Sequence, residues 1–452
     1  ASHWDVIKVS DGNDLDAIND AIKKAKKSKS KPTLIIVHTI IGYGSLLQGT
    51  SKVHGSPLKD DDILHTKQFY GYNYPPFTIP KEVYNKFKKT FIKRGKKAHT
   101  NWIMESEKFR QTPEGKQILS NFTPNIKALL KGSDKTDFEA NLEQATRKSS
   151  EEALNYYAQL VPNLIGGAAD VAGSVYTTLK NVSFFTRENP SGRNINFGVR
   201  EFLMASIGNG IALHGGFKPY VGCFLVFADY MKPAIRMSAI SKLPLIYIFS
   251  HDSISVGEDG PTHEPIEQLA MLRSIPNVDV IRPCDARETF AAYKLALLSE
   301  TTPTCIITTR HNVPLITNSS YEGVENGGYI ISKEKNRLDF TIIATGSEVS
   351  VAIEAQTKLL SKGIDTRVVS LPSFFVFEKQ TQEYKDQVFG LPYEKRIFVE
   401  MASSYGLYKY AKNVMSIDQF GRSAPFKDIV EFFDFTSENL CNRVENILKY
   451  NR

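Results

Sequence analysis

Polar side chains suited to acid–base chemistry and anion binding follow several apolar, strand-like segments of this 452-residue chain. His251 follows one such segment, and the sequence GEDGPTH occupies residues 257–263 shortly after it. Glu201 and Arg310 follow two further segments of the same kind. Ligands of open α/β sheets bind beyond the carboxyl ends of the strands, so these side chains are predicted to meet at one edge of one sheet.

Each of these residues has an ordinary structural explanation when it is taken alone. A glutamate in the first turn of a helix is favoured by the helix dipole, which would account for Glu201. A histidine after a strand is more often structural, as we expect for His38 and His214. Glycines such as Gly42 and Gly44 occur in any tight turn. An active site is favoured by the convergence on one predicted edge of His251, Asp259, His263, Glu201 and Arg310.

Strand and helix patterns alternate along the segments that would position these side chains. Residues 4–9 and 33–39 are predicted strands around a helix at residues 14–27, which makes a βαβ unit. From residue 42 to about residue 145 the chain is polar and is predicted to form loops and surface helices. The alternation then resumes, with further strands predicted at residues 195–197, 220–227, 245–249, 278–282, 304–309, 340–344, 366–370 and 396–400.

Helices are predicted between these strands at residues 285–299, 348–360 and about 436–448, the first of them with Asp285 and Glu288 as a capping box. Alternation of this kind implies three α/β domains with mostly parallel sheets. We expect the first domain with its linker at residues 1–115, a second domain at residues 116–318 and a C-terminal domain at residues 319–452.

The composition is that of a globular protein, with 41% hydrophobic and 23% charged residues. Neither a membrane-length apolar segment nor a secretion signal is evident, and the four cysteines are scattered, so we expect a cytoplasmic protein with reduced thiols and no membrane partner. The net charge of +7 comes partly from the lysine-rich residues 23–31. A solvated helix end explains that run better than a nucleic-acid patch, so no nucleic-acid partner is expected.

Taken together, the motifs resemble transketolases, which are thiamine-diphosphate enzymes. GEDGPTH at residues 257–263 is the most specific of them. The others are HG-x-PL at residues 54–58, GGAAD at 166–170, FGVRE at 197–201, TGSEV at 345–349 and FG-x-SAP at 420–425. The sequence departs from the family pattern at Ala168, Val171, Glu264 and His311; the last two replace glutamine.

The resemblance implies a thiamine-diphosphate-binding fold followed by a C-terminal α/β domain, and transfer of a two-carbon ketol unit between sugar phosphates. It implies thiamine diphosphate and Mg²⁺ or Ca²⁺ as cofactors, and catalytic roles for Glu201, His54 and His263. The residues implied to bind the cofactor are Ile41, His54, Asp170, Glu201, Phe224, Phe227 and Tyr230. Those implied to bind substrate are His54, Arg147, Ser174, His251, Asp259, His263 and Arg310.

A homodimer is also expected, because residues 201–214 carry the small side chains of Ala205, Ser206, Gly208, Gly210 and Ala212. Such residues allow close approach of a partner, although internal packing is their more common use. Two other functions stay open: dihydroxyacetone synthase-like transfer to formaldehyde, and a non-catalytic homologue that acts as a binding partner. A 1-deoxyxylulose-phosphate synthase fits the motifs less well.

The first domain offers only two clear strands, and both are apolar enough to be covered on two faces. We therefore expect a further segment before Ala1. The resemblance implies that the metal ligands lie in that segment, so no metal ligand is assigned within this chain. The 452 residues alone are accordingly expected to bind thiamine diphosphate weakly, to retain no stoichiometric metal and to show no ketol transfer.

Overall fold

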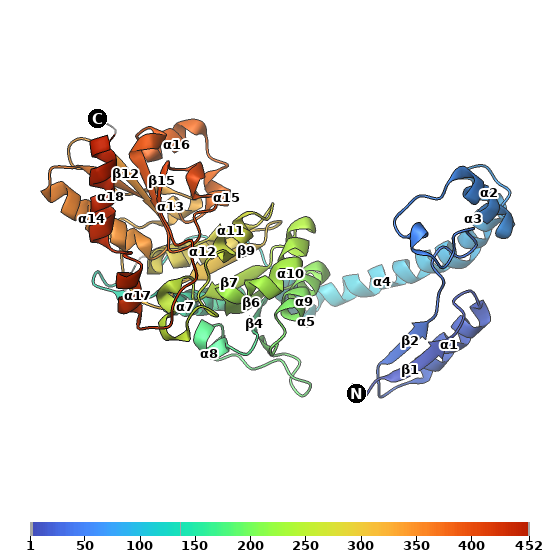
Figure 1. Cartoon of the computed structure of the whole chain (residues 1–452). Helices are drawn as coiled ribbons and strands as arrows, with labels where there is room; N and C mark the ends of the chain where they lie inside the picture. Colours follow the sequence, from blue (N-terminus) through green and yellow to red (C-terminus); the bar gives the residue numbers. More distant parts are fainter. Residues whose placement is uncertain (1–2, 136, 451–452) are drawn as a thin grey trace. The chain divides into compact units, whose positions relative to one another are not determined.

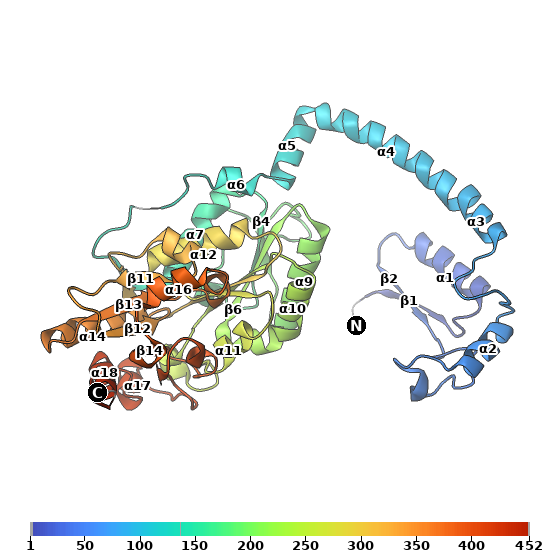
Figure 2. The same cartoon turned by 90° about the horizontal axis from the view of Figure 1, so that it is seen from above.

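The computed structural model describes residues 3–135 and 137–450 of the chain. These residues belong to two compact units, Ala1–Lys108 and Phe109–Arg452. Figures 1 and 2 show the elements of each unit from two directions. We describe each unit by itself.

The first unit begins with a βαβ arrangement. Strands β1 (Asp5–Val9) and β2 (Thr33–Val37) pair in parallel, and helix α1 (Leu15–Lys27) connects them. Asp14 caps α1 by accepting a hydrogen bond from the backbone N–H of Ala17, at 2.9 Å. The predicted βαβ unit is therefore confirmed. The side chains of Val6, Leu34 and Ile36 on this two-stranded sheet are about half exposed.

The segment predicted as loops and surface helices is largely helical. Its longest helix, α4 (Lys93–Gln111), has no buried residue, in agreement with a surface position. The other helical elements are η1 (Ser51–Val53), α2 (Asp60–Phe69), α3 (Lys81–Phe87), the π-helical turn η2 (Lys88–Ile92), α5 (Pro113–Phe122) and α6 (Ile126–Leu129).

The second unit contains a six-stranded parallel sheet with the strand order β5-β4-β6-β7-β9-β8. Its strands are β4 (Leu164–Ala168), β5 (Asn194–Asn196), β6 (Lys218–Phe224), β7 (Ile246–Ser250), β8 (Asp279–Ile281) and β9 (Thr304–Thr308). Strand β4 is missing from the sequence prediction because Gly166 and Gly167 interrupt its apolar pattern. Beside this sheet, β3 (Glu143–Ala145) and β10 (Asn312–Pro314) form a short antiparallel pair.

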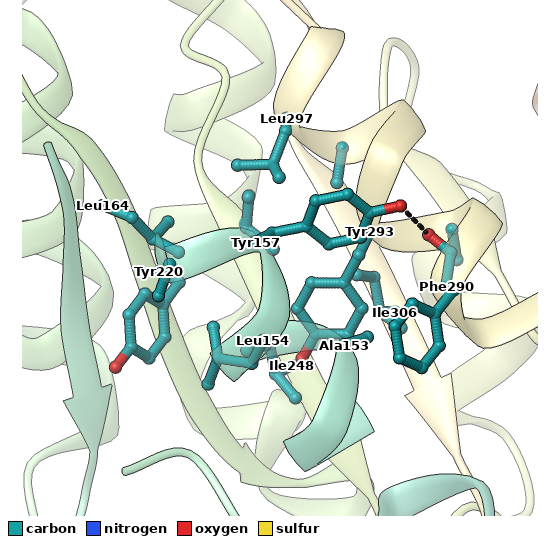
Figure 3. Close-up of a cluster of buried hydrophobic side chains, with 14 of the residues drawn as sticks. Ala153, Leu154, Tyr157, Leu164, Tyr220, Ile248, Phe290, Tyr293, Leu297 and Ile306 are labelled. Carbon is teal, nitrogen blue, oxygen red and sulfur yellow. Dashed lines mark hydrogen bonds between the residues drawn. The ribbon is translucent and has the colours of Figure 1, made fainter. Parts of the chain in front are cut away.

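Helices cover both faces of the six-stranded sheet. Helices α7 (Thr146–Leu160) and α12 (Ala286–Leu298) pack on one face, where Tyr157 and Tyr220 belong to the same core cluster. Figure 3 shows this cluster, in which the hydroxyl of Tyr157 donates a hydrogen bond to the carbonyl of Phe290 at 3.2 Å. The other face is covered by α9 (Glu201–His214), α10 (Ala228–Ile240) and α11 (Gln268–Arg273).

The C-terminal sheet has the strand order β11-β13-β12-β14-β15, and only β11 is antiparallel to its neighbour. Its strands are β11 (Tyr329–Ser332), β12 (Phe340–Ala344), β13 (Thr366–Ser370), β14 (Arg396–Val399) and β15 (Asn413–Met415). The predicted three sets of α/β elements are thus confirmed. The accompanying helices are α13 (Tyr321–Glu325), α14 (Glu348–Ser361), α15 (Phe374–Phe377), α16 (Gln382–Phe389), η5 (Tyr393–Lys395), η6 (Leu407–Lys409), α17 (Phe426–Phe432) and α18 (Ser437–Tyr450).

Two local predictions are wrong. The strand predicted at residues 220–227 ends at Phe224, and the chain turns there into the 3₁₀ helix η3 (Leu225–Phe227). The capping box is only half formed: Asp285 accepts from the backbone N–H of Glu288, but the Glu288 carboxylate accepts from the N–H of Cys284 instead of that of Asp285. Burial of Glu288 draws its side chain toward the C-terminal sheet, where Ser370 donates to it at 2.7 Å.

In the described part of the chain, no helix has the length and apolar character needed to cross a membrane. All four cysteines are buried and unpaired.

Candidate active site

A crevice is expected beside β4, because the connection from β4 leads to β5 on one side of it and the next connection, from β5, leads to β6 on its other side. The residues predicted for the site follow the carboxyl ends of these strands and their neighbours. Asp170 follows β4, Phe224 ends β6, His251 follows β7 and Arg310 follows β9. Glu201 begins α9, the helix after β5. The structure therefore brings these residues to one edge of the sheet.

Aromatic and histidine rings cluster at this edge. The rings of Phe224 and His251 stack with their centroids 3.8 Å apart. Phe227 lies between Phe224, at 6.0 Å, and Tyr230, at 6.1 Å, and all three rings are close to parallel. The rings of His263 and Phe227 are nearly perpendicular, with their centroids 5.5 Å apart. Since Phe227 is only partly buried and Tyr230 is exposed, a planar ring can stack here. The short helix η3 creates this slot by turning the chain after Phe224.

His251 is held in an uncommon backbone conformation. Its φ angle is 62°, its side chain is buried, and its Nδ1 lies 2.7 Å from the hydroxyl of Ser250. Burial, together with the positive charges of Arg147 and Arg310, lowers the pKa of His251 to about 3. His251 is therefore neutral near pH 7 and can offer a ring nitrogen to a polar ligand without carrying a positive charge.

Two arginines supply the positive charge beside His251. Arg147 donates a hydrogen bond to the carbonyl of Ser174 at 2.9 Å, and burial lowers the pKa of its guanidinium. Arg310 lies 3.6 Å from the carboxylate of Glu258 and donates to the carbonyl of Val256. Guanidinium groups bind phosphate in a bidentate manner, so this pair suits an anionic substrate.

Glu201 and Asp170 each lie close enough to Cys223 for their charges to act on it. Burial raises the pKa of the Cys223 thiol to about 12, and the negative charges of Glu201 and Asp170 contribute to that shift. Glu201 is half-buried. Its carboxylate is accordingly accessible to a ligand in the crevice.

Ile41 and His54 belong to the first unit. Ile41 is about half exposed, and its carbonyl accepts from the backbone N–H of Gly49 at 2.8 Å. His54 is exposed at the end of η1, where its backbone N–H donates a hydrogen bond to the carbonyl of Ser51 at 3.0 Å. Asp259, in the second unit, is also exposed and ends η4 (Ile254–Asp259).

Glu264 is a residue of this site whose environment the sequence pattern did not predict. The side chain is 2% exposed, and neither carboxylate oxygen makes a hydrogen bond of normal geometry to the described residues. A Cβ at Gly421 would lie 1.7 Å from one of these oxygens, so only glycine fits there. Burial raises the pKa of Glu264 to about 7, and nearby Asp259 adds to the shift, while the backbone N–H groups of Gly257 and Arg422 oppose it.

Replacing Glu264 by Gln is expected to stabilise the protein at alkaline pH. Because the folded state raises this pKa, ionised Glu264 destabilises the fold above pH 7, and the cost disappears as the pH falls toward 4.5. We expect a gain of about 1–2 kcal/mol at pH 8.5 and almost none at pH 5, measured by urea unfolding at both values. Glu267→Gln, at an exposed position nearby, is the control and should show no gain at either pH. A gain from Glu264→Gln that is equal at both pH values would contradict the burial argument.

The residues present fit the organic part of an aromatic cofactor better than they fit a metal ion. The nearly parallel rings of Phe224, Phe227 and Tyr230 offer flat apolar faces of the kind on which a planar aromatic ring stacks. No three acidic, histidine or cysteine side chains of the described residues are grouped as metal ligands would be.

This fold and this site define an α/β protein in which aromatic, histidine and arginine side chains gather at the switch point of a parallel sheet. Three family models match the chain: "Transketolase, thiamine diphosphate binding domain" at residues 1–124, "Transketolase, pyrimidine binding domain" at residues 143–315 and "Transketolase-like TK C-terminal domain" at residues 327–436. The chain belongs to the transketolase family and is therefore a transferase with a thiamine-diphosphate-binding domain.

Individual relatives agree with this assignment. The transketolase of Bacillus subtilis is 44% identical over 99% of this chain and 69% of its own length. A crystal structure of Pichia stipitis transketolase in complex with sedoheptulose-7-phosphate has a TM-score of 0.91, with 39% identity, over 99% of this chain and 67% of that one. Transketolase from Leishmania mexicana has a TM-score of 0.90 and 36% identity. The chain thus spans about two thirds of the length of these relatives.

Proposed function

We propose that the protein transfers a two-carbon ketol unit reversibly from a ketose phosphate to an aldose phosphate in the pentose phosphate pathway. The observation that carries this proposal is the grouping of Arg147, His251, His263 and Arg310 beside the aromatic slot at one sheet edge. A site that binds a sugar phosphate needs cationic side chains for the phosphate and polar side chains for the hydroxyls. The relative crystallised with sedoheptulose-7-phosphate supports the same substrate class.

Thiamine diphosphate is the proposed organic cofactor. When bound, it supplies the electron sink for cleavage of the bond between carbons 2 and 3 of the ketose. Phe224, Phe227 and Tyr230 would hold its pyrimidine, with Asp170 and Glu201 beside that ring, and Ile41 and His54 are proposed contacts from the first domain. We also propose that a divalent cation, Mg²⁺ or Ca²⁺, accompanies the diphosphate.

The remaining residues have proposed roles toward the substrate. Glu201 would hold and return the proton of the pyrimidine nitrogen, and its accessible position at the start of α9 supports this role. His54, Asp259 and His263 would orient the hydroxyls near the reacting carbons and move a proton there. The phosphate would be bound by Arg147, Ser174, His251 and Arg310. The proposed domain division stays at residues 1–115, 116–318 and 319–452.

A homodimer in the cytoplasm is proposed as the working form. Gly208 packs internally, because a Cβ there would lie 2.9 Å from Leu245, so this small residue of α9 serves the core. Large apolar side chains on α9 and α10 support the dimer instead, since they are exposed: Phe202, Leu203, Leu213, Met237 and Ile240. The four unpaired thiols are consistent with a reducing compartment.

We expect light scattering to give twice the subunit mass for the protein that carries this sequence. Replacing Leu203 and Met237 by Lys should shift the protein to monomers, because both side chains would have to be buried in the interface. Lysine at exposed Leu360, which lies outside these helices, is the control and should leave the dimer intact. A stable monomer of the parent protein in the presence of thiamine diphosphate would refute the proposal.

The function itself is tested in the whole protein that carries this sequence, by ketol transfer from a ketose phosphate to an aldose phosphate with and without added thiamine diphosphate and Mg²⁺. Transfer that depends on the cofactor supports the proposal. A marked preference for formaldehyde as acceptor would favour the dihydroxyacetone synthase alternative. Binding of thiamine diphosphate without any transfer would favour the non-catalytic homologue.

A further inference from the structure

A fully buried arginine connects the six-stranded sheet to the C-terminal domain. Arg282 directly follows β8, and its side chain is completely inaccessible to solvent. Its Nε donates to a carboxylate oxygen of Asp252 at 2.9 Å. Its Nη1 donates to Glu348 at 2.8 Å and to the hydroxyl of Thr345 at 3.0 Å. One guanidinium therefore joins the residue after His251 to the start of α14.

The ionic contacts extend beyond these three partners. Glu400, which follows β14, lies 3.7 Å from Arg282 and accepts two hydrogen bonds from Arg273, at 2.7 and 2.8 Å. The five groups comprise two positive and three negative charges. Although burial disfavours its charge, the carboxylates of Glu348, Asp252 and Glu400 raise the pKa of Arg282, so it stays ionised. A charge so enclosed requires all of its partners in place.

The sequence motif TGSEV, at residues 345–349, acquires a role in this arrangement. Thr345 and Glu348 are ligands of Arg282, and a Cβ at Gly346 would lie 2.8 Å from its guanidinium carbon. Gly346 also has a positive φ of 55°. The motif therefore packs closely around the Arg282 guanidinium and binds it. It has no other part in the proposed chemistry.

On the other side of Arg282, its partner Asp252 is next in sequence to His251, a proposed substrate-binding residue. Asp252 adjoins His251, whose left-handed backbone conformation is costly for a residue other than glycine. Such a conformation persists only when the surrounding contacts hold it. The contact between Arg282 and Asp252 is one of these, and the stacking of His251 on Phe224 is another.

We propose that Arg282 is a positioning residue, which anchors Asp252 to the C-terminal domain and thereby fixes His251 for substrate binding. This inference rests on the proposed function, in which His251 contacts the sugar phosphate. It also gives the C-terminal domain a part in the reaction, because Thr345 and Glu348 orient Arg282.

The test uses Arg282→Lys, which keeps the positive charge but cannot make the hydrogen bonds to Asp252, Glu348 and Thr345 together. We expect KM for a ketose phosphate to rise about tenfold, with a much smaller change in kcat and in the affinity for thiamine diphosphate. The matched control is Arg287→Lys, because Arg287 donates to Ser319 and to the carbonyl of Ile316 and lies over the ring of Phe138, and none of these residues belongs to the candidate site. The control should leave KM unchanged.

A double-mutant cycle separates positioning from a general loss of structure. If Arg282 acts through His251, Arg282→Lys will have little further effect on KM in a His251→Ala background. Equal effects of Arg282→Lys on KM in both backgrounds would overturn the proposal. A rise in KM accompanied by comparable falls in kcat and in the affinity for the cofactor would overturn it too.

A spectroscopic measurement keeps this inference distinct from the proposed function. In protein with ¹⁵N-labelled histidine, Arg282→Lys is expected to shift the His251 ring resonances, which His251→Ala identifies by their loss, and Arg287→Lys is not. Unchanged His251 resonances in Arg282→Lys would overturn the positioning role. Absence of ketol transfer by the whole protein that carries this sequence would instead overturn the proposed function.

Discussion

Turnover should fall by about 10²–10⁴-fold when Glu201 is replaced by Gln, the range typical for loss of a positioned proton-transfer group. Glutamine keeps the size and a hydrogen-bonding end but cannot take up or release a proton near neutral pH. Affinity for thiamine diphosphate should weaken only a few-fold, since the aromatic slot of Phe224, Phe227 and Tyr230 is unchanged. Steady-state ketol transfer and fluorescence titration of the cofactor measure the two effects.

Glu267→Gln provides the matched control, because Glu267 is another glutamate at a helix start, the N-cap of α11, and is exposed. It should retain full activity. If Glu201→Gln keeps activity within a few-fold of the parent, the assignment of Glu201 as the proton-holding group is wrong.

A second large effect is expected from Arg310→Ala, which removes a guanidinium from the positive group beside His251. A charge-assisted hydrogen bond contributes about 1.5–3 kcal/mol, so KM for phosphorylated sugars should rise roughly ten- to a hundredfold. Short donors without a phosphate cannot use Arg310 and should be affected much less. Initial rates with a ketose phosphate and with an unphosphorylated ketose provide the comparison.

Arg337→Ala controls for loss of a positive charge, since Arg337 is exposed and pairs only with Asp339 in the described contacts. This variant should leave both KM values as they are. Equal losses with phosphorylated and unphosphorylated donors in Arg310→Ala would show that Arg310 mainly holds η4 through its bond to the carbonyl of Val256.

The sequence predicts the fold well where the hydrophobic pattern is continuous. Strands at residues 340–344 and 366–370 have the predicted bounds, because both are fully buried and rich in the β-branched residues that favour strands. Strand β4 was missed because glycines occupy its centre. The end of β6 at Phe224 was missed because the apolar run continues into η3, and periodicity does not distinguish a strand from one helical turn.

The candidate site likewise has some features that could be predicted from the sequence and others that could not. Its position at the strand ends follows from topology, so the grouping of His251, His263 and Arg310 could be predicted. The contacts of Arg282 could not, because its partners Asp252, Glu348 and Glu400 are far apart in the sequence and only packing brings them together. The environment of Glu264 likewise depends on Gly421, from another domain of the chain.

The strand order of the six-stranded sheet has a consequence for how the site is assembled during folding. Strand β9 lies between β7 and β8, although β8 precedes it in the chain, so β8 has no partner in this sheet until β9 enters. Since all its pairings are parallel, every one of them also closes a long loop, which slows folding. Arg282 follows β8 and Arg310 follows β9. Pairing of β9 with β7 thus places Arg310 at the sheet edge beside His251, and it provides the neighbour on which β8, with Arg282 at its end, joins the same sheet.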